Sequence, residues 1–366
     1  MKKKICYVTT IPPTFESFML ESALYLNDNG WDISLISSYS EDIEEILQNK
    51  IHYYPVKMKR GISLDGIKAT YQMYKIFKKE KFDVVQYSTP NAGFYASIAS
   101  ALAGLNCRIY HLMGFRYLGF SGLKKEIFKK IDTLACMLST HVECVSASNY
   151  KLGLLDKVFK KDKTCIIWNG STGGVNLKRF NYNYRNIWKE EIRNELKIEE
   201  DEFVFGFAGS VSRDKGISEL IDSFENIDNC KIIIIGNKEF ENDKELEKKF
   251  DLFEKKDNVI FCGRKQNIEK YYSAMDVLIL PSYREGFGMV LAEAAALGTP
   301  AITTRIPGPL DVIVENETAL VVEPKDVQSL TNAIDYCLNN KAIIKNMETN
   351  CVNYIVNTFD SKILCE

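Results

Sequence analysis

The feature that most constrains this chain is a repeated alternation of short apolar runs with longer amphipathic segments. A short apolar run is typical of a buried strand, and a longer segment with apolar residues three or four apart is typical of a helix. Strands that alternate with helices form parallel sheets covered on both faces. The alternation runs through the first half and starts again near residue 203, so we expect two doubly wound α/β domains.

The alternation assigns the elements as follows. Strands of the first half are expected at residues 5–8, 32–36, 84–87, 108–112 and 141–145. Strands of the second half are expected at residues 203–208, 231–235, 259–261, 277–280, 301–303 and 319–322. Helices are expected at residues 16–28 and 64–79, the second with Ile67, Tyr71, Tyr74 and Phe77 on one face. A Tyr-, Asn- and Arg-rich linker near Phe180 separates domains 1–180 and 181–355, and we expect the tail, 356–366, to pack back on the first domain.

Composition places the chain among globular proteins. Its 366 residues are 26% charged and 46% hydrophobic. No run reaches the ~18 apolar residues that a membrane helix needs, and the basic start leads into a short apolar run that indicates a first strand and not a signal peptide. The 10 cysteines are dispersed without a C-x-x-C pair, which favours reduced cytosolic thiols and argues against a zinc site.

The net charge of -2 conceals two halves of opposite charge. Residues 1–180 contain 25 Lys and Arg against 16 Asp and Glu, a charge of +9, and the remainder contains 22 against 33, a charge of -11. Such an excess concerns partners and not the fold. We interpret the basic half as facing an anionic surface or substrate, although an uneven scatter of surface lysines would give the same count.

The turns after the first strands argue against a dinucleotide cofactor. Enzymes that bind one carry G-x-G-x-x-G between the first strand and its helix. Residues 9–14 contain no glycine, and the glycines of residues 206–211 have the wrong spacing. Ligands still bind at the loops that follow the carboxyl ends of such strands, so the cleft between the two domains is the expected active site.

The most informative segment, residues 281–298, joins an expected buried strand to an Ala- and Leu-rich helix. Its loop contains Glu285, Gly286 and Gly288, and a further glycine ends the helix. Glycines at a helix entrance let a ligand approach the backbone, and the N–H groups there favour a phosphate. Glu293 lies roughly 7 Å along the helix axis from Gly288. The two glutamates can therefore bind separate parts of one extended ligand, and carboxylates suit the hydroxyl donors of sugars.

Each glutamate also has a plainer explanation when it is taken alone. Glu285 could be a partner of the helix dipole, and Glu293 could be an ordinary solvated helix residue. The combination is what makes the segment specific.

Taken together, residues 281–298 resemble the E-x7-E motif of the family 4 glycosyltransferases, which have the GT-B fold, retain anomeric configuration and mostly use nucleotide sugars. Residues 206–217 resemble the family's G-R-x-x-x-x-K-G stretch, and residues 308–311 stand where its glycine turn follows the next strand. Four stretches resemble the subgroup that builds capsular and lipid-linked polysaccharides: residues 88–93, 114–122, 169–176 and 304–309. The resemblance covers nearly the whole chain and implies two Rossmann-like domains with an interdomain cleft.

Carried over position by position, the resemblance implies the roles of the donor-binding residues. Glu285 would contact the hydroxyls of the donor sugar, and Glu293 those of the ribose. The sugar or the diphosphate would meet the backbone around Gly286, Phe287, Gly288, Met289 and Val290. Lys215 would neutralise the diphosphate of the leaving nucleotide, because charge builds there in the transition state. Its plainer explanation is a solvent-facing lysine in a turn.

Two positions depart from the family pattern. Ser210 stands where an arginine is usual, and Arg213 is a candidate for the second positive charge. Met113 stands where many members have a histidine near the donor's C6 hydroxyl. His111, on the same strand face, is a candidate catalytic substitute, although a lone strand histidine more often has a structural role. Arg264, in the turn after the third strand of the second domain, is a candidate for the base pocket.

The mechanism that the resemblance implies is front-face attack, in which the leaving phosphate takes the acceptor's proton and no covalent enzyme intermediate forms. The spacing of Glu285 and Glu293 does not favour a glycosidase-like pair of carboxylates flanking the bond. No D-x-D motif follows a strand of the first domain, so we expect no metal ion and no other cofactor. A UDP-linked donor is expected from its frequency in the family alone.

Lysines and aromatic residues alternate in the basic half, at residues 53–60, 71–81 and 123–130. Such surfaces suit the anionic inner leaflet of a membrane, although each segment alone is compatible with a solvated face. No nucleic-acid motif accompanies them, and the acidic half would repel a polyanion. With the subgroup resemblance, they predict a polyprenyl-diphosphate-linked acceptor and a cytoplasmic protein at the inner face of the bacterial plasma membrane.

The sequence thus predicts a retaining glycosyltransferase of surface polysaccharide assembly, in capsule, O-antigen or exopolysaccharide biosynthesis. Two alternatives stay open. A sugar-nucleotide epimerase of the same fold would need catalytic acids and a set of histidines that this chain lacks around its expected cleft. A catalytically silent GT-B protein that binds a partner enzyme is kept open by Ser210 and Met113.

Overall fold

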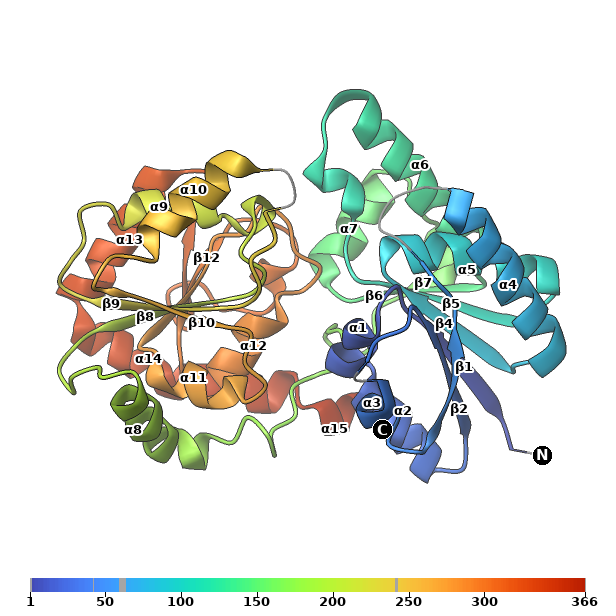
Figure 1. Ribbon diagram of the computed structural model, residues 1–366, viewed down its shortest axis with the longest axis horizontal. Helices are drawn as coiled ribbons and strands as arrows, with labels where there is room; N and C mark the ends of the chain where they lie inside the picture. Colours follow the sequence, from blue (N-terminus) through green and yellow to red (C-terminus); the bar gives the residue numbers. More distant parts are fainter. Residues whose placement is uncertain (1, 42, 59–63, 241–242, 366) are drawn as a thin grey trace. The chain divides into compact units, whose positions relative to one another are not determined.

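The computed structural model describes residues 2–41, 43–58, 64–240 and 243–365. The chain forms two compact units, the first ending at Gly173 and including the chain end from Leu364, and the second running from Gly174 to Ile363. Each unit is a parallel sheet with helices on both faces (Figure 1), as the alternation predicts. The boundaries proposed from sequence, 1–180, 181–355 and 356–366, stay predictions.

The sheet of the first unit has the order β3-β2-β1-β4-β5-β6-β7 within the described residues. Its strands are β1 (Lys4–Val8), β2 (Asp32–Ser37), β3 (Ile51–Pro55), β4 (Val84–Ser88), β5 (Cys107–Leu112), β6 (His141–Cys144) and β7 (Thr164–Cys165). The helices are α1 (Pro12–Phe18), α2 (Leu20–Asp28), α3 (Ile43–Leu47), α4 (Leu64–Glu80), α5 (Pro90–Ala103), α6 (Gly122–Leu138) and α7 (Ala147–Leu155).

Alternation along the strands gives this sheet two apolar faces. Cys6 and Val8 of β1 face the core formed with α4, α5 and α6. Ile5 and Tyr7 face the core formed with α1, α2 and α3. The alternation of side chains along β1 therefore decides which helices pack on each face of the first sheet.

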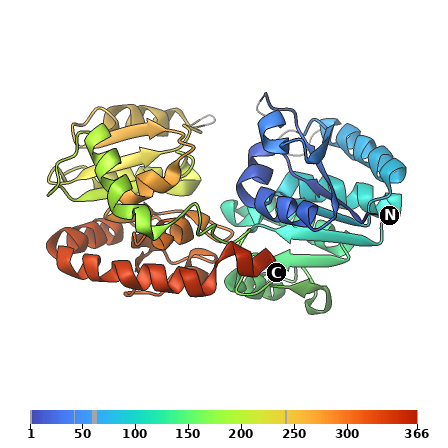
Figure 2. The ribbon, with the colours of Figure 1, turned by 90° about the horizontal axis from the view of Figure 1, so that it is seen from below.

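The sheet of the second unit has the order β10-β9-β8-β11-β12-β13 within the described residues. Its strands are β8 (Val204–Ala208), β9 (Lys231–Ile235), β10 (Val259–Gly263), β11 (Val277–Leu280), β12 (Ala301–Thr304) and β13 (Ala319–Val322). The helices are α8 (Arg185–Glu195), α9 (Ile217–Ser223), α10 (Lys244–Phe253), α11 (Ile268–Ala274), α12 (Met289–Ala296), α13 (Val327–Asn339) and α14 (Lys341–Thr358). Helix α15 (Ser361–Cys365) ends the chain, and Figure 2 shows α13 and α14 together on one side of the second unit.

Short 3-10 helices complete the description. They are η1 (Arg116–Gly119), η2 (Lys161–Lys163), η3 (Tyr182–Tyr184), η4 (Arg213–Lys215) and η5 (Pro309–Asp311). In the described part of the chain, no helix is both long and apolar enough to cross a bilayer.

The structure corrects three expectations from the sequence. The helix expected at residues 16–28 is two helices, because Pro12 starts α1 early and Met19 leaves the helical region with a φ of -132°. The face of α4 is rotated: Ile67 and Tyr71 are exposed, and Met73 is buried instead. Strands β3 and β7 are additional, because the polar pattern of β3 and the two-residue length of β7 hide them from a search for apolar runs.

The topology sets where a ligand can bind in the second unit. The strand order reverses between β8 and β11, which are neighbours in the sheet. Since the strands are parallel, the loops after β8 and β11 leave the same edge side by side. This is the topological switch point, where open α/β sheets bind ligands.

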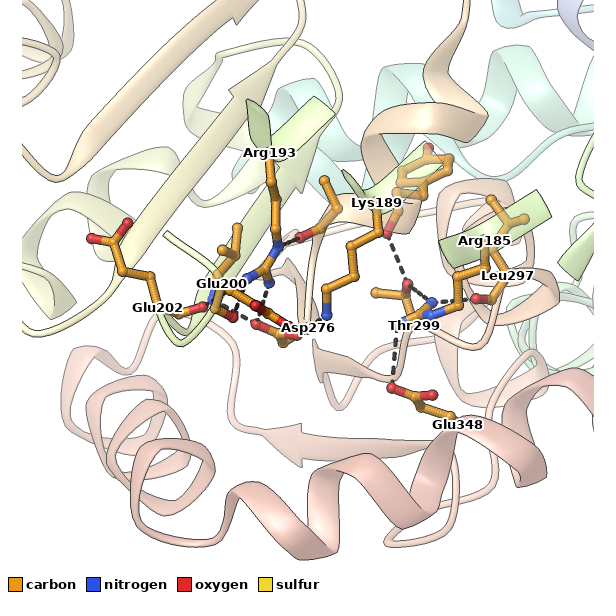
Figure 3. A network of polar contacts seen from close by, with 12 residues as sticks. Arg185, Lys189, Arg193, Glu200, Glu202, Asp276, Leu297, Thr299 and Glu348 are labelled. Carbon is orange, nitrogen blue, oxygen red and sulfur yellow. Dashed lines mark hydrogen bonds and ion pairs between the residues drawn. The ribbon is translucent and has the colours of Figure 1, made fainter. Parts of the chain in front are cut away.

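A charged network fixes helix α8 to this sheet (Figure 3). Asp276, just before β11, accepts hydrogen bonds from Lys189 at 2.9 Å, from Arg193 at 2.8 Å and from the backbone N–H of Val204 at 2.8 Å. Arg193 is 5% exposed, so its guanidinium depends on partners inside the protein. Asp276 therefore joins α8, β8 and β11 through one carboxylate.

Arg185, at the start of α8, makes a second connection in the same view. Its guanidinium donates to the Thr299 hydroxyl at 2.8 Å and to the carbonyl oxygen of Leu297, and pairs with Glu348 of α14 at 3.4 Å. The helix α8 is thereby held at both ends, which fixes the scaffold on which the loops of the sheet edge stand.

Replacing Asp276 tests the contribution of this network. We expect Asp276→Ala to lower the free energy of unfolding by about 2–3 kcal/mol, because it leaves the buried Arg193 without its carboxylate. Urea denaturation measures the change. Glu191→Ala removes the exposed partner of Lys270 and should cost less than about 1 kcal/mol. Equal losses in the two variants would contradict the assigned role.

Candidate active site

Three loops converge at the carboxyl edge of the second sheet. Tyr283, after β11, donates its backbone N–H to the carbonyl oxygen of Asp214, after β8, at 2.9 Å. Gly216 lies against the same strand end: a Cβ at this position would stand 2.1 Å from the carbonyl oxygen of Pro281. Gly308, after β12, has a φ of +96°, and its Cβ would stand 2.9 Å from the carbonyl oxygen of Gly286. Only glycine allows these close approaches.

The convergence brings Lys215 and Glu285 together across 70 residues of sequence. The Lys215 ammonium lies 2.5 Å from Oε1 of Glu285, and the Ser282 hydroxyl donates to the same oxygen at 2.8 Å. The Lys215 side chain is 26% exposed and that of Glu285 is 13% exposed. The pair is thus largely enclosed by protein and still reachable by a ligand.

Helix α12 begins directly after this pair. Gly288 is its N-cap residue and has a φ of +97°, a conformation that favours glycine. Phe287 is 1% exposed and packs edge-on against Phe359, with ring centroids 5.2 Å apart. Met289 and Val290 open the helix as half-buried residues. The loop is therefore anchored by an apolar side chain at the entrance of α12, and the N-terminus of a helix suits an anion.

Glu293 lies on the next turn of α12 and is half-buried. Tyr272 of α11 donates its phenol hydroxyl to Oε2 of Glu293 at 3.1 Å. Burial raises the pKa of Glu293 to about 7, against the opposing effects of the Tyr272 hydrogen bond and the charge of Arg179. Glu293 can thus gain or lose its proton near neutral pH.

Three further residues of this unit, Ser210, Arg213 and Arg264, were predicted to bind the donor. Arg213 pairs with Asp243, the N-cap residue of α10, through hydrogen bonds of 2.5 and 3.0 Å. Hydrogen bonding between the two side chains raises the pKa of Arg213 and lowers that of Asp243. Ser210 is half-buried beyond the end of β8, and Arg264 is exposed beyond β10. Lys215 is the cation that the structure places on Glu285, and ligand roles for Ser210, Arg213 and Arg264 stay predictions.

His111 belongs to the first unit, near the end of β5. It is 3% exposed, and its Nδ1 lies 3.0 Å from a carboxylate oxygen of Glu143, its neighbour on β6. Among the described residues, neither ring nitrogen has a partner with hydrogen-bond geometry. A role for His111 in the same active site stays a prediction.

Two residues of the site were not found from the sequence. Ser282 stands 3 residues before Glu285, and its polar character after an apolar strand was the available signal. Tyr272 reaches Glu293 only through the packing of α11 on α12, which leaves no local signal. In the described ranges, no group of three or more His, Cys, Asp and Glu side chains is arranged to hold a metal ion.

Residues 188–356 match the family model described as glycosyl transferases group 1. Residues 4–147 match the model described as glycosyl transferase 4-like. The first match contains the loop with Glu285 and the helix with Glu293, and the second covers most of the first unit.

Two relatives match over nearly their full lengths. The capsular polysaccharide biosynthesis glycosyltransferase CapM of Staphylococcus aureus is 29% identical, over 100% of this chain and 95% of the relative. The Escherichia coli UDP-Gal:alpha-D-GlcNAc-diphosphoundecaprenol alpha-1,3-galactosyltransferase is 27% identical, over 98% of this chain and 94% of the relative.

Solved structures share the fold. HepE of Anabaena, in complex with UDP-glucose, has a TM-score of 0.81 at 19% identity, over 99% of this chain and 97% of that one. The lipopolysaccharide glycosyltransferase WaaG has a TM-score of 0.76 at 16% identity, over 99% and 97% of the two chains. At these identities the likeness confirms the two-domain α/β architecture.

The raised pKa of Glu293 predicts a pH dependence of stability. Between the ordinary pKa of 4.5 and about 7, the folded state keeps a proton that the unfolded state has lost. The free energy of unfolding should therefore fall as pH rises through this window. In Glu293→Gln this contribution is absent, so the decrease between pH 5 and 7 should be smaller by about 1–2 kcal/mol.

Urea denaturation at a series of pH values checks this expectation. Glu317→Gln, at an exposed glutamate of the same unit, is the control and should keep the wild-type slope. An unchanged slope in Glu293→Gln would mean that Glu293 ionises as an ordinary surface carboxyl group.

Proposed function

Because the chain belongs to the family 4 glycosyltransferases of the GT-B fold, we propose that it transfers a sugar from a UDP-sugar to a polyprenyl-diphosphate-linked glycan. Anomeric configuration is retained, and the product contributes to a surface polysaccharide. The observation that carries the proposal is the Lys215–Glu285 pair beside the N-terminus of α12, with Glu293 further along the same helix.

The geometry suits the three parts of a nucleotide sugar. The Glu285 carboxylate accepts hydrogen bonds from the sugar hydroxyls, since an ionised carboxylate is an acceptor only. The diphosphate lies at the start of α12, since the N-terminus of a helix favours an anion. Glu293 accepts from the ribose hydroxyls, and its raised pKa makes this contact stronger above neutral pH.

Lys215 carries the catalytic charge in this proposal. When the bond between sugar and diphosphate breaks, negative charge grows on the leaving phosphate. An ammonium beside the diphosphate stabilises that charge more in the transition state than in the bound substrate, which accelerates the reaction. The leaving phosphate then takes the proton of the attacking acceptor hydroxyl, so no further base is required.

We propose that the reaction needs no metal ion, because no D-x-D motif is present to hold one.

Relatives support the choice of donor and acceptor. The E. coli relative is named for a UDP-Gal donor and a diphosphoundecaprenol-linked acceptor, and HepE was solved with UDP-glucose. The S. aureus relative is named for capsular polysaccharide biosynthesis. A uridine nucleotide, a lipid-linked acceptor and a surface polysaccharide are therefore the substrates and product to test first.

Donor use is tested with a panel of UDP-sugars and a synthetic polyprenyl diphosphate sugar. We expect transfer by the wild type without added metal, and a loss of about 100-fold or more in Glu285→Gln and in Lys215→Ala. Glu317→Gln, at an exposed position, is the control and should keep full activity. NMR of the product should show the donor's anomeric configuration. Full activity in Glu285→Gln, or an inverted product, would argue against the proposal.

The acceptor's lipid tail requires a membrane-facing surface, and α6 offers one. Leu123 is 77% exposed and Ile127 is 44% exposed near the start of this helix. Lys124, Lys125 and Lys130 are exposed among them. Apolar side chains flanked by lysines suit an anionic bilayer surface.

A shallow cavity extends this surface. Its volume is about 300 Å³, and its lining contains Lys129, Lys130 and Lys157, the carboxylates of Glu126 and Asp156, and the apolar Leu134 and Met137. Lys129 pairs with Asp156 at 3.4 Å, so Lys130 and Lys157 are the lysines that suit lipid phosphates, and the apolar residues suit acyl chains. We therefore propose that the protein binds peripherally to the inner face of the bacterial plasma membrane through α6.

Vesicle co-sedimentation tests this surface. The wild type should bind vesicles that contain phosphatidylglycerol at low salt, and binding should weaken at high salt because exposed charges are screened. Lys124→Glu combined with Lys125→Glu should lose most of the binding, at ~1 kcal/mol or more per lysine. Lys255→Glu combined with Lys345→Glu, at exposed positions of the second unit, is the charge-matched control. Equal binding by the two double variants would rule out α6 as the membrane surface.

A further inference from the structure

Ser282 is a buried hydroxyl that the proposed function leaves without a role. It is 0% exposed and directly follows Pro281 at the end of β11. Its Oγ donates to Oε1 of Glu285 at 2.8 Å, and the Lys215 ammonium contacts the same oxygen at 2.5 Å. One carboxylate oxygen thus receives a neutral donor and a cationic donor.

The backbone that carries Ser282 is held from both sides. The Thr304 hydroxyl donates to the carbonyl oxygen of Ser282 at 2.6 Å, and the Thr303 hydroxyl donates to that of Leu280 at 3.1 Å. Both threonines belong to β12 and are buried. On the other side, Tyr283 donates its N–H to Asp214. A hydroxyl on a backbone held in this way has little freedom to follow a moving ligand.

The two donors on Glu285 differ in what they can do during the reaction. A lysine ammonium ends a flexible stem and carries three donors, so it can turn towards a diphosphate as charge grows there. Ser282 is neutral and fixed, so its hydrogen bond persists when the ammonium turns. Without the Ser282 hydrogen bond, the Glu285 carboxylate would lose its orientation towards the sugar hydroxyls when the Lys215 ammonium turns to the diphosphate.

We propose that Ser282 is a positioning residue, which holds the Glu285 carboxylate towards the donor sugar while Lys215 serves the diphosphate. This inference rests on the proposed function, because it takes the donor contact of Glu285 as given. Ser282 acts through Glu285 and touches no substrate atom. Its removal should therefore affect the sugar and leave the binding of the nucleotide alone unchanged.

Comparing UDP with a UDP-sugar tests the inference. In Ser282→Ala, kcat/KM for the UDP-sugar should fall about 10- to 100-fold, as for a lost hydrogen bond to a charged group, and the Kd of UDP should change less than about 2-fold. Ser223→Ala is the matched control, since Ser223 is 2% exposed and donates to backbone oxygens of α9 and α13. That control should keep both values.

A double-mutant cycle separates positioning from general damage. In a Glu285→Ala background, Ser282→Ala should cause no further loss of the residual activity or of UDP-sugar binding, because the two residues act as one unit. Ser282→Cys, which has a weak donor of similar size, should be intermediate. Additive losses, an equal weakening of UDP and UDP-sugar binding, or a kcat/KM within about 2-fold of the wild type would each overturn the inference.

The same data distinguish this inference from the proposed function. If Glu285→Ala abolishes transfer and Ser282→Ala does not impair it, the inference fails and the proposed function stands. If Glu285→Ala transfers as well as the wild type, or the wild type binds no UDP-sugar, the proposed function fails and the inference fails with it.

Discussion

The contact between the Lys215 ammonium and the Glu285 carboxylate depends on backbone packing more than on the two side chains. They stand in loops after β8 and β11, which meet because the strand order reverses between these strands. The loops can approach only because Gly216 leaves room for the carbonyl oxygen of Pro281. A side chain at Gly216 would separate the loops and the charged pair with them. The topology of the sheet and one glycine thus determine the electrostatics of the site.

We attribute the affinity for the donor's diphosphate to a few groups close to it and not to the net charge of the second half. The second half of the sequence has a charge of -11, so an approaching nucleotide meets a negative environment. Attraction must come from Lys215 and the first N–H groups of α12. Arg213 is paired with Asp243 in this structure, and its role towards the diphosphate stays a prediction. The positive charge of the chain is concentrated in the first half, to which we assign the proposed contacts with the membrane and the acceptor.

Residues in regular patterns were predictable from the sequence, and residues that depend on tertiary contacts were not. Apart from β3 and β7, the strands of both sheets follow from periodicity, and the helix after Gly288 follows from glycine placement. Ile67 was predicted on the same face of α4 as Phe77, but it is exposed. Helical spacing shows which residues share a face and does not show which of them contact the sheet. Tyr272 was missed, because its contact with Glu293 is set by the packing of α11 on α12. Ser282 lies only 3 residues before Glu285 and was missed, because the sequence does not show which group its hydroxyl contacts.

In the proposed complex, one nucleotide sugar lies along Glu285, Lys215 and Glu293. The decisive measurement is a crystal structure with an unreactive UDP-sugar analogue. We expect sugar hydroxyls within ~3 Å of Glu285, a diphosphate oxygen at the same distance from Lys215, and the ribose on Glu293. A sugar bound away from Glu285, or a diphosphate held without Lys215, would rule out this complex.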